Sequence, residues 1–201
     1  IMSPISPFEE NLPKNQANYS PLTPLSFLTR TAEVFPERTA VIHGEIKRSW
    51  RETLKRCTRL ASALKKKGVV QGTTVSVMAP NVPELLEAHF GALMTGGVLN
   101  ALNIRLEAET LAYILEHGES QVLITDREFS PVIQKVLQQL EDPPLVIDID
   151  DQMAEGGELL GEMDYEAFLK TGDEDFEWNL PEDEWQAVSL NYTSGTTGKP
   201  K

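Results

Sequence analysis

The chain has 201 residues, of which 40% are hydrophobic, and a formal net charge of −13 at neutral pH. Such a length can bury one sizeable core, and the sequence lacks both the apolar run of a membrane span and the pattern of a signal peptide. Nucleic-acid binders show a basic face, whereas 17 acidic residues and a single basic one lie between Glu141 and Trp185. We therefore expect a globular cytoplasmic protein without a membrane span or a nucleic-acid partner.

The first third of the chain predicts a lead-in, two helices and a strand pair. Residues 1–22 are rich in proline and read as an extended lead-in. Thr23 is placed to cap a helix whose first residue is Pro24, and Ser49 with Glu52 forms a capping box for a second helix. We expect helices over residues 23–35 and 49–67, and two short strands on either side of Gly44.

The middle of the chain alternates regularly between strands and helices. We expect strands over 74–78, 98–102, 121–125 and 145–149, and helices over 81–93, 108–116 and 130–140. Strands separated by helices of this length predict right-handed crossovers and a parallel sheet with helices on both faces, an α/β fold. Asn81 with Glu84 is the expected cap of the first of these helices, and its predicted inward stripe is Val82, Leu85, Leu86, His89, Phe90 and Leu93.

The pattern loosens into an acidic segment at about 150–184, which we predict to be loosely structured apart from a short helix over 165–170. We favour the interpretation that this segment is a solvent-exposed connection, and a binding surface for a basic partner is the alternative. Trp178 and Trp185 are interpreted as anchors of this segment. One further strand is expected within 185–192.

Residues 190–201, "LNYTSGTTGKPK", combine flexible glycines with hydrogen-bond donors. Gly195 and Gly198 allow several backbone N–H groups to point at one anion, hydroxyl groups add donors, and lysines add positive charge. This combination suits a polyphosphate. A Walker A loop is excluded because Thr193 stands where that motif needs its first glycine, and Pro200 where it needs serine or threonine.

The same string, from Tyr192 to Lys201, closely resembles the phosphate loop of the adenylate-forming superfamily. Over residues 24–201 the order of elements, with "NVPE" and "LNIR" motifs, resembles the acyl-CoA synthetase branch of that family. Gly97 to Asn103 depart from the pattern of peptide-synthetase adenylation domains. Within the branch, the motifs are most similar to ligases for short and medium-chain acids, including methylmercaptopropionate–CoA ligases and plant-type acyl-activating enzymes.

The resemblance implies that residues 23–201 are the N-terminal part of the large AMP-binding domain, with the C-terminal domain absent. It implies ATP with Mg²⁺, coenzyme A and a carboxylic acid as substrates, and no tightly bound cofactor. The implied phosphate-binding residues are Thr193, Ser194, Gly195, Thr196, Thr197, Gly198, Lys199 and Lys201, with Thr196 or Thr197 nearest the metal.

The resemblance assigns no catalytic residue within the chain, so we expect the isolated chain to be inactive. A different acceptor, as in luciferases or peptide synthetases, and a non-catalytic interaction module through residues 141–185 are the alternatives. A peroxisomal location is the alternative to the cytoplasm if the protein is eukaryotic. The oligomeric state stays open.

The remaining reactive side chains favour structural roles. Cys57 falls on an apolar helix stripe and is expected to be a buried thiol. His43, His89 and His117 lie beside a turn, on a helix stripe and in the last turn of a helix, and none has a partner at metal-ligand spacing.

Overall fold

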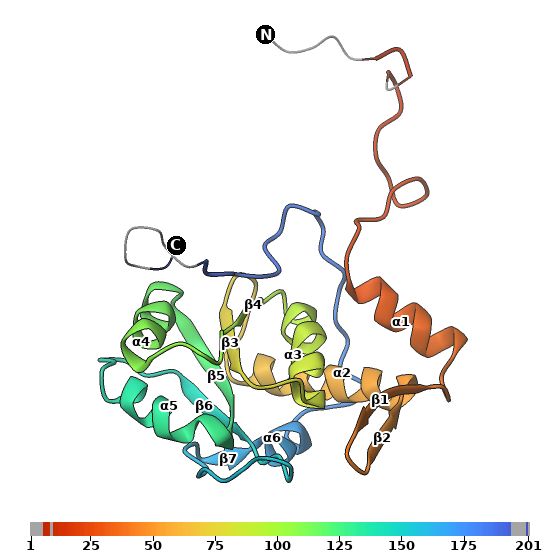
Figure 1. Ribbon diagram of the computed structural model, residues 1–201. Coiled ribbons are helices and arrows are strands. Elements are labelled where there is room, and N and C mark those ends of the chain that lie inside the picture. The colour runs from red at the N-terminus through yellow and green to blue at the C-terminus, as the bar shows by residue number, and fades with distance from the viewer. Residues whose placement is uncertain (1–5, 9, 194–199, 201) are drawn as a thin grey trace.

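The computed structural model describes residues 6–8, 10–193 and 200, and Figure 1 shows their arrangement. The elements are α1 (Leu25–Val34), β1 (Thr39–His43), β2 (Ile46–Ser49), α2 (Trp50–Lys66), β3 (Thr74–Met78), α3 (Pro83–Met94), β4 (Val98–Ala101), α4 (Ala108–His117), β5 (Ser120–Asp126), a 3₁₀ turn (Arg127–Phe129), α5 (Ser130–Leu137), β6 (Leu145–Ile149), β7 (Met163–Asp164) and α6 (Tyr165–Lys170). The lead-in before α1 runs away from the body of the molecule (Figure 1).

A parallel sheet of five strands, in the order β4-β3-β5-β6-β7, forms the centre of the protein. Every neighbouring pair is parallel, which confirms the predicted α/β fold. The strands β1 and β2 form a separate antiparallel hairpin around Gly44, as predicted. The strand β7 has no counterpart in the sequence prediction. Two residues are too few to show an alternating pattern, and only the pairing with β6 defines this strand.

Helices cover both faces of this sheet. On one face α2, α3 and α6 bury residues such as Leu64, Ala88 and Phe168 against the strands. On the other, α4 and α5 contribute Leu111 and Ile133 to a second core (Figure 1). A smaller cluster seats α1 on α2 and contains the buried thiol of Cys57, as predicted, and burial raises the pKa of this thiol.

The ends of the helices follow the local sequence in most places. The Ser49 hydroxyl accepts a hydrogen bond from the Glu52 N–H at 3.2 Å, and the Glu52 carboxylate accepts one from the Ser49 N–H at 2.7 Å. This reciprocal pair confirms the capping box of α2. The predicted cap of α3 is wrong: the helix is preceded by Val82 and starts at Pro83, whose fixed φ suits the first helical position, and no side chain caps it.

The buried face of α3 also differs from the predicted one. The residues it buries are Pro83, Glu84, Glu87, Ala88, Gly91, Ala92 and Met94. Of the predicted stripe only Val82 is buried, while Leu85 and Leu93 are half-buried and Leu86 is 36% exposed. Close helix packing explains the difference, because a Cβ at Gly91 would lie 2.6 Å from the Leu60 side chain of α2. Gly91 therefore allows α2 and α3 to approach closely, and larger residues of α3, such as Met94, also pack against the α2 side.

The acidic segment lies against the body at several points. The Gly161 N–H donates to the buried Asp148 carboxylate at 2.6 Å, and a Cβ at Gly161 would overlap the carbonyl of Val146. A Cβ at Gly172 would likewise overlap the carbonyl of Arg59. The helix predicted over 165–170 is α6.

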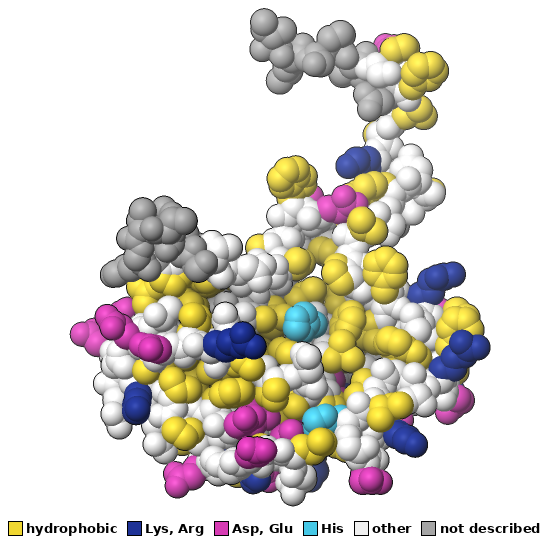
Figure 2. All heavy atoms as spheres, in the orientation of Figure 1, with side chains coloured by type: hydrophobic (Ala, Val, Ile, Leu, Met, Phe, Trp, Pro, Cys, Tyr) yellow, Lys and Arg dark blue, Asp and Glu magenta, His cyan; other side chains and the backbone are white. Residues whose placement is uncertain are grey.

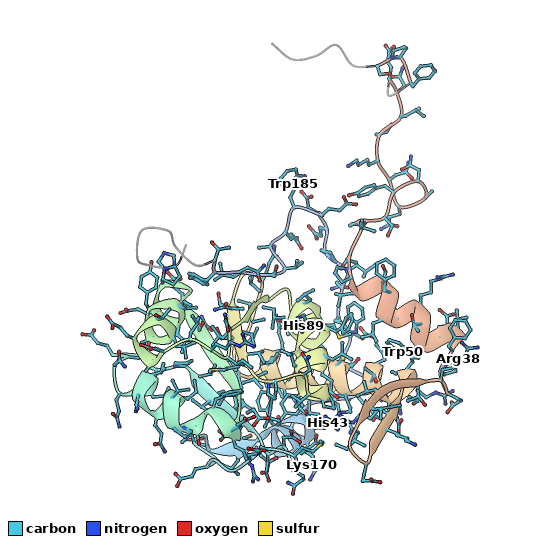
Figure 3. All side chains as sticks on the ribbon, in the orientation of Figure 1. Arg38, His43, Trp50, His89, Lys170 and Trp185 are labelled. Atoms are coloured by element: carbon cyan, nitrogen blue, oxygen red, sulfur yellow. The ribbon has the colours of Figure 1, made fainter. Side chains whose placement is uncertain are left out.

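The two tryptophans of the acidic segment behave differently. Trp178 packs against the cluster formed by α1 and α2, as predicted. Trp185 is 93% exposed and points away from the body (Figure 3), so its interpretation as an anchor is wrong. The chain turns there, and the Asp183 carboxylate accepts the Trp185 N–H at 2.9 Å.

Candidate functional site

The glycine-rich loop is the candidate site, and most of it lies outside the described residues. Of its predicted phosphate-binding residues the structure describes Thr193 alone, whose side chain is exposed. Ser194, Gly195, Thr196, Thr197, Gly198, Lys199 and Lys201 are not described, so their roles stay predictions. The structure does describe how the chain enters this loop.

The entry to the loop is tied to the outer edge of β4. The Leu99 N–H donates to the Val188 carbonyl at 3.0 Å, and the Leu190 N–H donates to the Leu99 carbonyl at 2.9 Å. These two bonds make a parallel bridge between Leu99 and Ser189. The strand predicted over 185–192 is therefore reduced to a single bridge, because the chain leaves β4 directly afterwards.

After leaving β4, the chain contacts the C-terminal end of α4. The Tyr192 hydroxyl and His117 Nδ1 share a hydrogen bond of 2.7 Å, and the two rings meet edge to face with centroids 5.7 Å apart. On its other side the His117 ring stacks on Tyr113, with centroids 5.3 Å apart. The sequence signal for this contact was weak, because 75 positions separate the two hydrogen-bonded residues.

An open apolar groove of about 710 Å³ lies beside this entry. Its floor is the outward stripe of α3, including Leu85, Leu86 and Phe90, and its rim includes β1 and Val188. Figure 2 shows hydrophobic side chains gathered over α3 on this face, and Figure 3 places His89 among them. The His89 ring bonds the Leu85 carbonyl at 2.7 Å, which satisfies one ring nitrogen within the helix.

A buried charge cluster fixes α3 from the opposite side. The Glu87 side chain is completely buried and accepts hydrogen bonds from Arg48 of β2 at 2.7 Å and from Arg56 of α2 at 2.6 Å. The Tyr165 hydroxyl donates to its second oxygen at 3.0 Å. Burial raises the pKa of Glu87, while the arginine partners oppose that shift. The cluster joins four elements and holds α3, and thereby the groove, in place.

Acidic side chains also gather near the carboxyl ends of β5 and β6, where α/β folds commonly bind ligands. Asp126 accepts the Glu128 N–H at 2.9 Å, and burial raises the pKa of Asp126. His43 pairs with Asp151 at 3.0 Å, which ties the hairpin to the loop after β6. Across the described part of the chain, no three histidine, cysteine or acidic side chains are grouped to hold a metal ion. These side chains therefore fix loops.

None of the helices in the described ranges is long and apolar enough to cross a bilayer. Residues 28–201 match the protein family described as "AMP-binding enzyme". The chain is 46% identical over 204 residues to an acetate–CoA ligase of Humulus lupulus and, over the same length, to a peroxisomal acetate/butyrate–CoA ligase of Arabidopsis thaliana. Each alignment covers 96% of this chain, which spans 36% of the length of either relative.

Solved structures with the same fold include a CoA ligase by name. The chain superimposes on an anthranilate–CoA ligase in complex with anthranoyl-AMP with a TM-score of 0.75 and 25% identity, over 88% of this chain and 33% of that one. It superimposes on the N-terminal domain of FACL13 from Mycobacterium tuberculosis with a TM-score of 0.73 and 26% identity, over 88% and 42% of the two chains. The sheet and its helices are thus shared with these enzymes.

Proposed function

The chain belongs to the AMP-binding enzyme family, and from this membership we propose that the whole protein converts a short or medium-chain carboxylic acid to its CoA thioester at the expense of ATP. The observation that carries the proposal is the 46% identity, across nearly the whole chain, to ligases named for acetate and butyrate. The proposal concerns the whole protein because this chain spans about a third of the length of those relatives.

The proposed reaction has two steps. A carboxylate oxygen attacks the α-phosphorus of ATP, forming an acyl-adenylate and releasing pyrophosphate, and the thiol of coenzyme A then displaces AMP to give the thioester. Negative charge develops on the phosphoryl oxygens in the first step, so the protein contributes by positioning donors and cations around them. Mg²⁺ enters as part of the ATP substrate.

The closing loop is proposed to hold the β and γ phosphates. Backbone N–H groups near Gly195 and Gly198 and the hydroxyl groups of Thr193, Ser194, Thr196 and Thr197 supply the donors, with Thr196 or Thr197 nearest the metal. Lys199 and Lys201 supply positive charge. Two features support this role: the residue types suit a polyphosphate, and the entry to the loop is tied to both β4 and α4.

Residues 1–201 alone are proposed to be inactive, because the relatives use a chain nearly three times as long. The cytoplasm is the proposed location, and the peroxisome is the alternative that the name of the Arabidopsis relative suggests. Neither proposal depends on the identity of the acid.

A chimeric enzyme tests the activity. Residues 1–201 would replace the matched third of the Humulus acetate–CoA ligase, and acid-dependent ATP–pyrophosphate exchange would be measured with acetate, butyrate and hexanoate. We expect exchange and CoA thioester formation from the chimera, and neither from the chain alone. A folded chimera without exchange would overturn the proposed activity, and turnover by the chain alone would overturn its proposed inactivity.

The phosphate-binding role is tested in the same chimera through one lysine. Lys199→Ala should raise the KM for ATP about tenfold or more, since a hydrogen bond from a charged donor contributes about 1.5–3 kcal/mol. Lys135→Ala, which removes an exposed lysine of α5, is the matched control and should leave this KM unchanged. Equal KM values for both variants would show that Lys199 does not contribute to ATP binding.

A further inference from the structure

We propose that His117 is a positioning residue for the phosphate loop, acting through its hydrogen bond to the hydroxyl of Tyr192. This inference rests on the proposed function, because it assumes that the loop beginning at Thr193 binds the phosphates of ATP. It is carried by the 2.7 Å bond and by the two ring contacts that hold the histidine between Tyr113 and Tyr192.

The base of this contact is rigid. His117 is the last residue of α4, and that helix buries Leu111, Ile114 and Leu115 in the core on its face of the sheet. The Tyr113 ring lies one helical turn earlier and stacks on the imidazole at an interplanar angle of 28°. Tyr113 therefore supports the imidazole at the point where Tyr192 meets it.

Glycine at position 118 makes room for the contact. A Cβ there would lie 3.1 Å from the Leu190 side chain and 3.3 Å from the Tyr192 hydroxyl, as well as 2.9 Å from the Ile114 carbonyl. The chain before the loop consequently passes directly over the end of α4. A Cβ at position 118 would be a tight contact for both side chains.

The two attachments of the entry segment lie on either side of one residue. Leu190 is bound to β4 through its N–H, and Tyr192 is bound to α4 through its hydroxyl, so Asn191 is held between them. Thr193, the first predicted phosphate-binding residue, follows directly. Burial raises the pKa of the Tyr192 hydroxyl.

This arrangement determines how the loop starts. Ordering the backbone of a free residue costs conformational entropy, and a loop whose root is already fixed loses less of it when the ligand binds. The anchor therefore favours ATP affinity without touching ATP. Its loss should weaken binding moderately and leave the chemical groups of the loop intact.

Two aromatic substitutions test the anchor in the chimeric enzyme that carries residues 1–201. Tyr192→Phe removes only the hydroxyl, and His117→Phe keeps a ring against Tyr113 but removes the nitrogen. Amide hydrogen exchange over residues 190–193 and the Kd of MgATP by calorimetry would be measured for each and for the double variant. We expect exchange about two- to tenfold faster and affinity about two- to tenfold weaker in each single variant, the range of one neutral hydrogen bond.

The effects of the His117 and Tyr192 substitutions should also be coupled. The double variant should match either single one, because both changes break the same bond. His117→Asn, whose side chain can present a polar atom near the position of Nδ1, should restore most of the protection and affinity. Tyr19→Phe, the same chemical change in the N-terminal lead-in, is the matched control and should change neither quantity.

Unchanged exchange at residues 190–193 in both single variants, or additive effects in the double variant, would overturn the anchor. Faster exchange with an unchanged Kd would keep the contact but overturn its role in positioning the loop. A folded chimera that binds no MgATP before any substitution would instead count against the phosphate loop itself, and the exchange data would still decide whether the anchor exists.

Discussion

The Arg56 guanidinium donates through Nε to Glu87 Oε1 at 2.6 Å, joining α2 to α3 beneath the apolar groove. The carboxylate has zero exposure, and Arg48 reaches the same oxygen at 2.7 Å. Burial acts to lower the pKa of Arg56, but its hydrogen bonds with Glu166 and Glu87 outweigh that effect and raise it. Arg56 therefore depends on its carboxylate partners.

Removing Glu87 should therefore destabilise the protein more than removing one carboxylate of an exposed ion pair. We expect Glu87→Leu to lower the free energy of unfolding by about 3–5 kcal/mol, because it leaves Arg48 and Arg56 buried without this carboxylate. Glu37→Gln breaks the exposed pair with Arg51 and should cost less than about 1 kcal/mol. Urea denaturation monitored by tryptophan fluorescence measures both, and equal losses would contradict this account.

The capping box gives a prediction about pH. Backbone and side-chain hydrogen bonds from Ser49 lower the pKa of Glu52 below its ordinary value of 4.5. A carboxyl with a lowered pKa in the folded state adds stability above its unfolded pKa and loses it as the pH falls through the folded value. The Tm of the wild-type chain should exceed that of Glu52→Gln at neutral pH, and the gap should close as the pH falls below 4.5.

Glu33→Gln provides the comparison for that experiment, because Glu33 is an exposed carboxyl on α1 outside any capping box. Its Tm should follow the wild-type curve at every pH. A gap for Glu52→Gln that stays constant from neutral to acidic pH would show that the cap does not depend on the carboxylate charge.

Gly91→Ala tests the close contact between α2 and α3. Alanine is favoured over glycine in a helix by about 1 kcal/mol, but overpacking a core costs about 1–3 kcal/mol. The added methyl group would meet three carbon atoms of Leu60 at 2.6–3.0 Å, so we expect a net loss of about 1–2 kcal/mol in the free energy of unfolding. A more stable variant would mean that Leu60 moves aside freely.

The same pair can be examined as a double-mutant cycle. Leu60→Ala alone should cost about 2–5 kcal/mol through the cavity it leaves. The methyl group of Gly91→Ala partly fills that cavity, so the double variant should lose less stability than the sum of the two single variants. Additive losses would indicate that the two side chains do not compete for the same space.

Two leucine-to-alanine changes distinguish the groove from the core. Leu64 is fully buried between α2 and the sheet, and Leu64→Ala should lower the free energy of unfolding by about 2–5 kcal/mol. Leu86 lies in the groove and is 36% exposed, so Leu86→Ala should cost less than about 1 kcal/mol. Similar costs at both positions would mean that the groove is covered in solution.

Local signals allowed most elements to be predicted. Capping residues, stop glycines and the spacing of apolar side chains predicted the helices α2 and α5 and four of the five strands of the sheet, since each signal acts within one element. The helix α6 has the predicted bounds, Tyr165–Lys170. The Asp164 carboxylate caps its first turn by accepting the Ala167 N–H.

Features that depend on the packing of distant segments could not be predicted in this way. Periodicity identified α3 as amphipathic but could not say that Gly91 lies against Leu60 of α2. The site was predicted only from the composition of the glycine-rich loop over residues 190–201. Its anchor at His117 required knowledge of which helix end lies next to residue 192, and no local pattern contains that information.

The acidic segment shows where substitutions can accumulate without harm. Its carboxylates at Glu155 and Glu177 face solvent, so acidic, amide and hydroxyl side chains are interchangeable at such positions. Gly161 and Gly172 have no such freedom, because a single added carbon would overlap the carbonyl of Val146 or of Arg59. The carboxylates of Asp151 and Glu166 lack that freedom as well, because they pair with His43 and Arg56, so the charge of this stretch can change only at its unpaired, exposed positions.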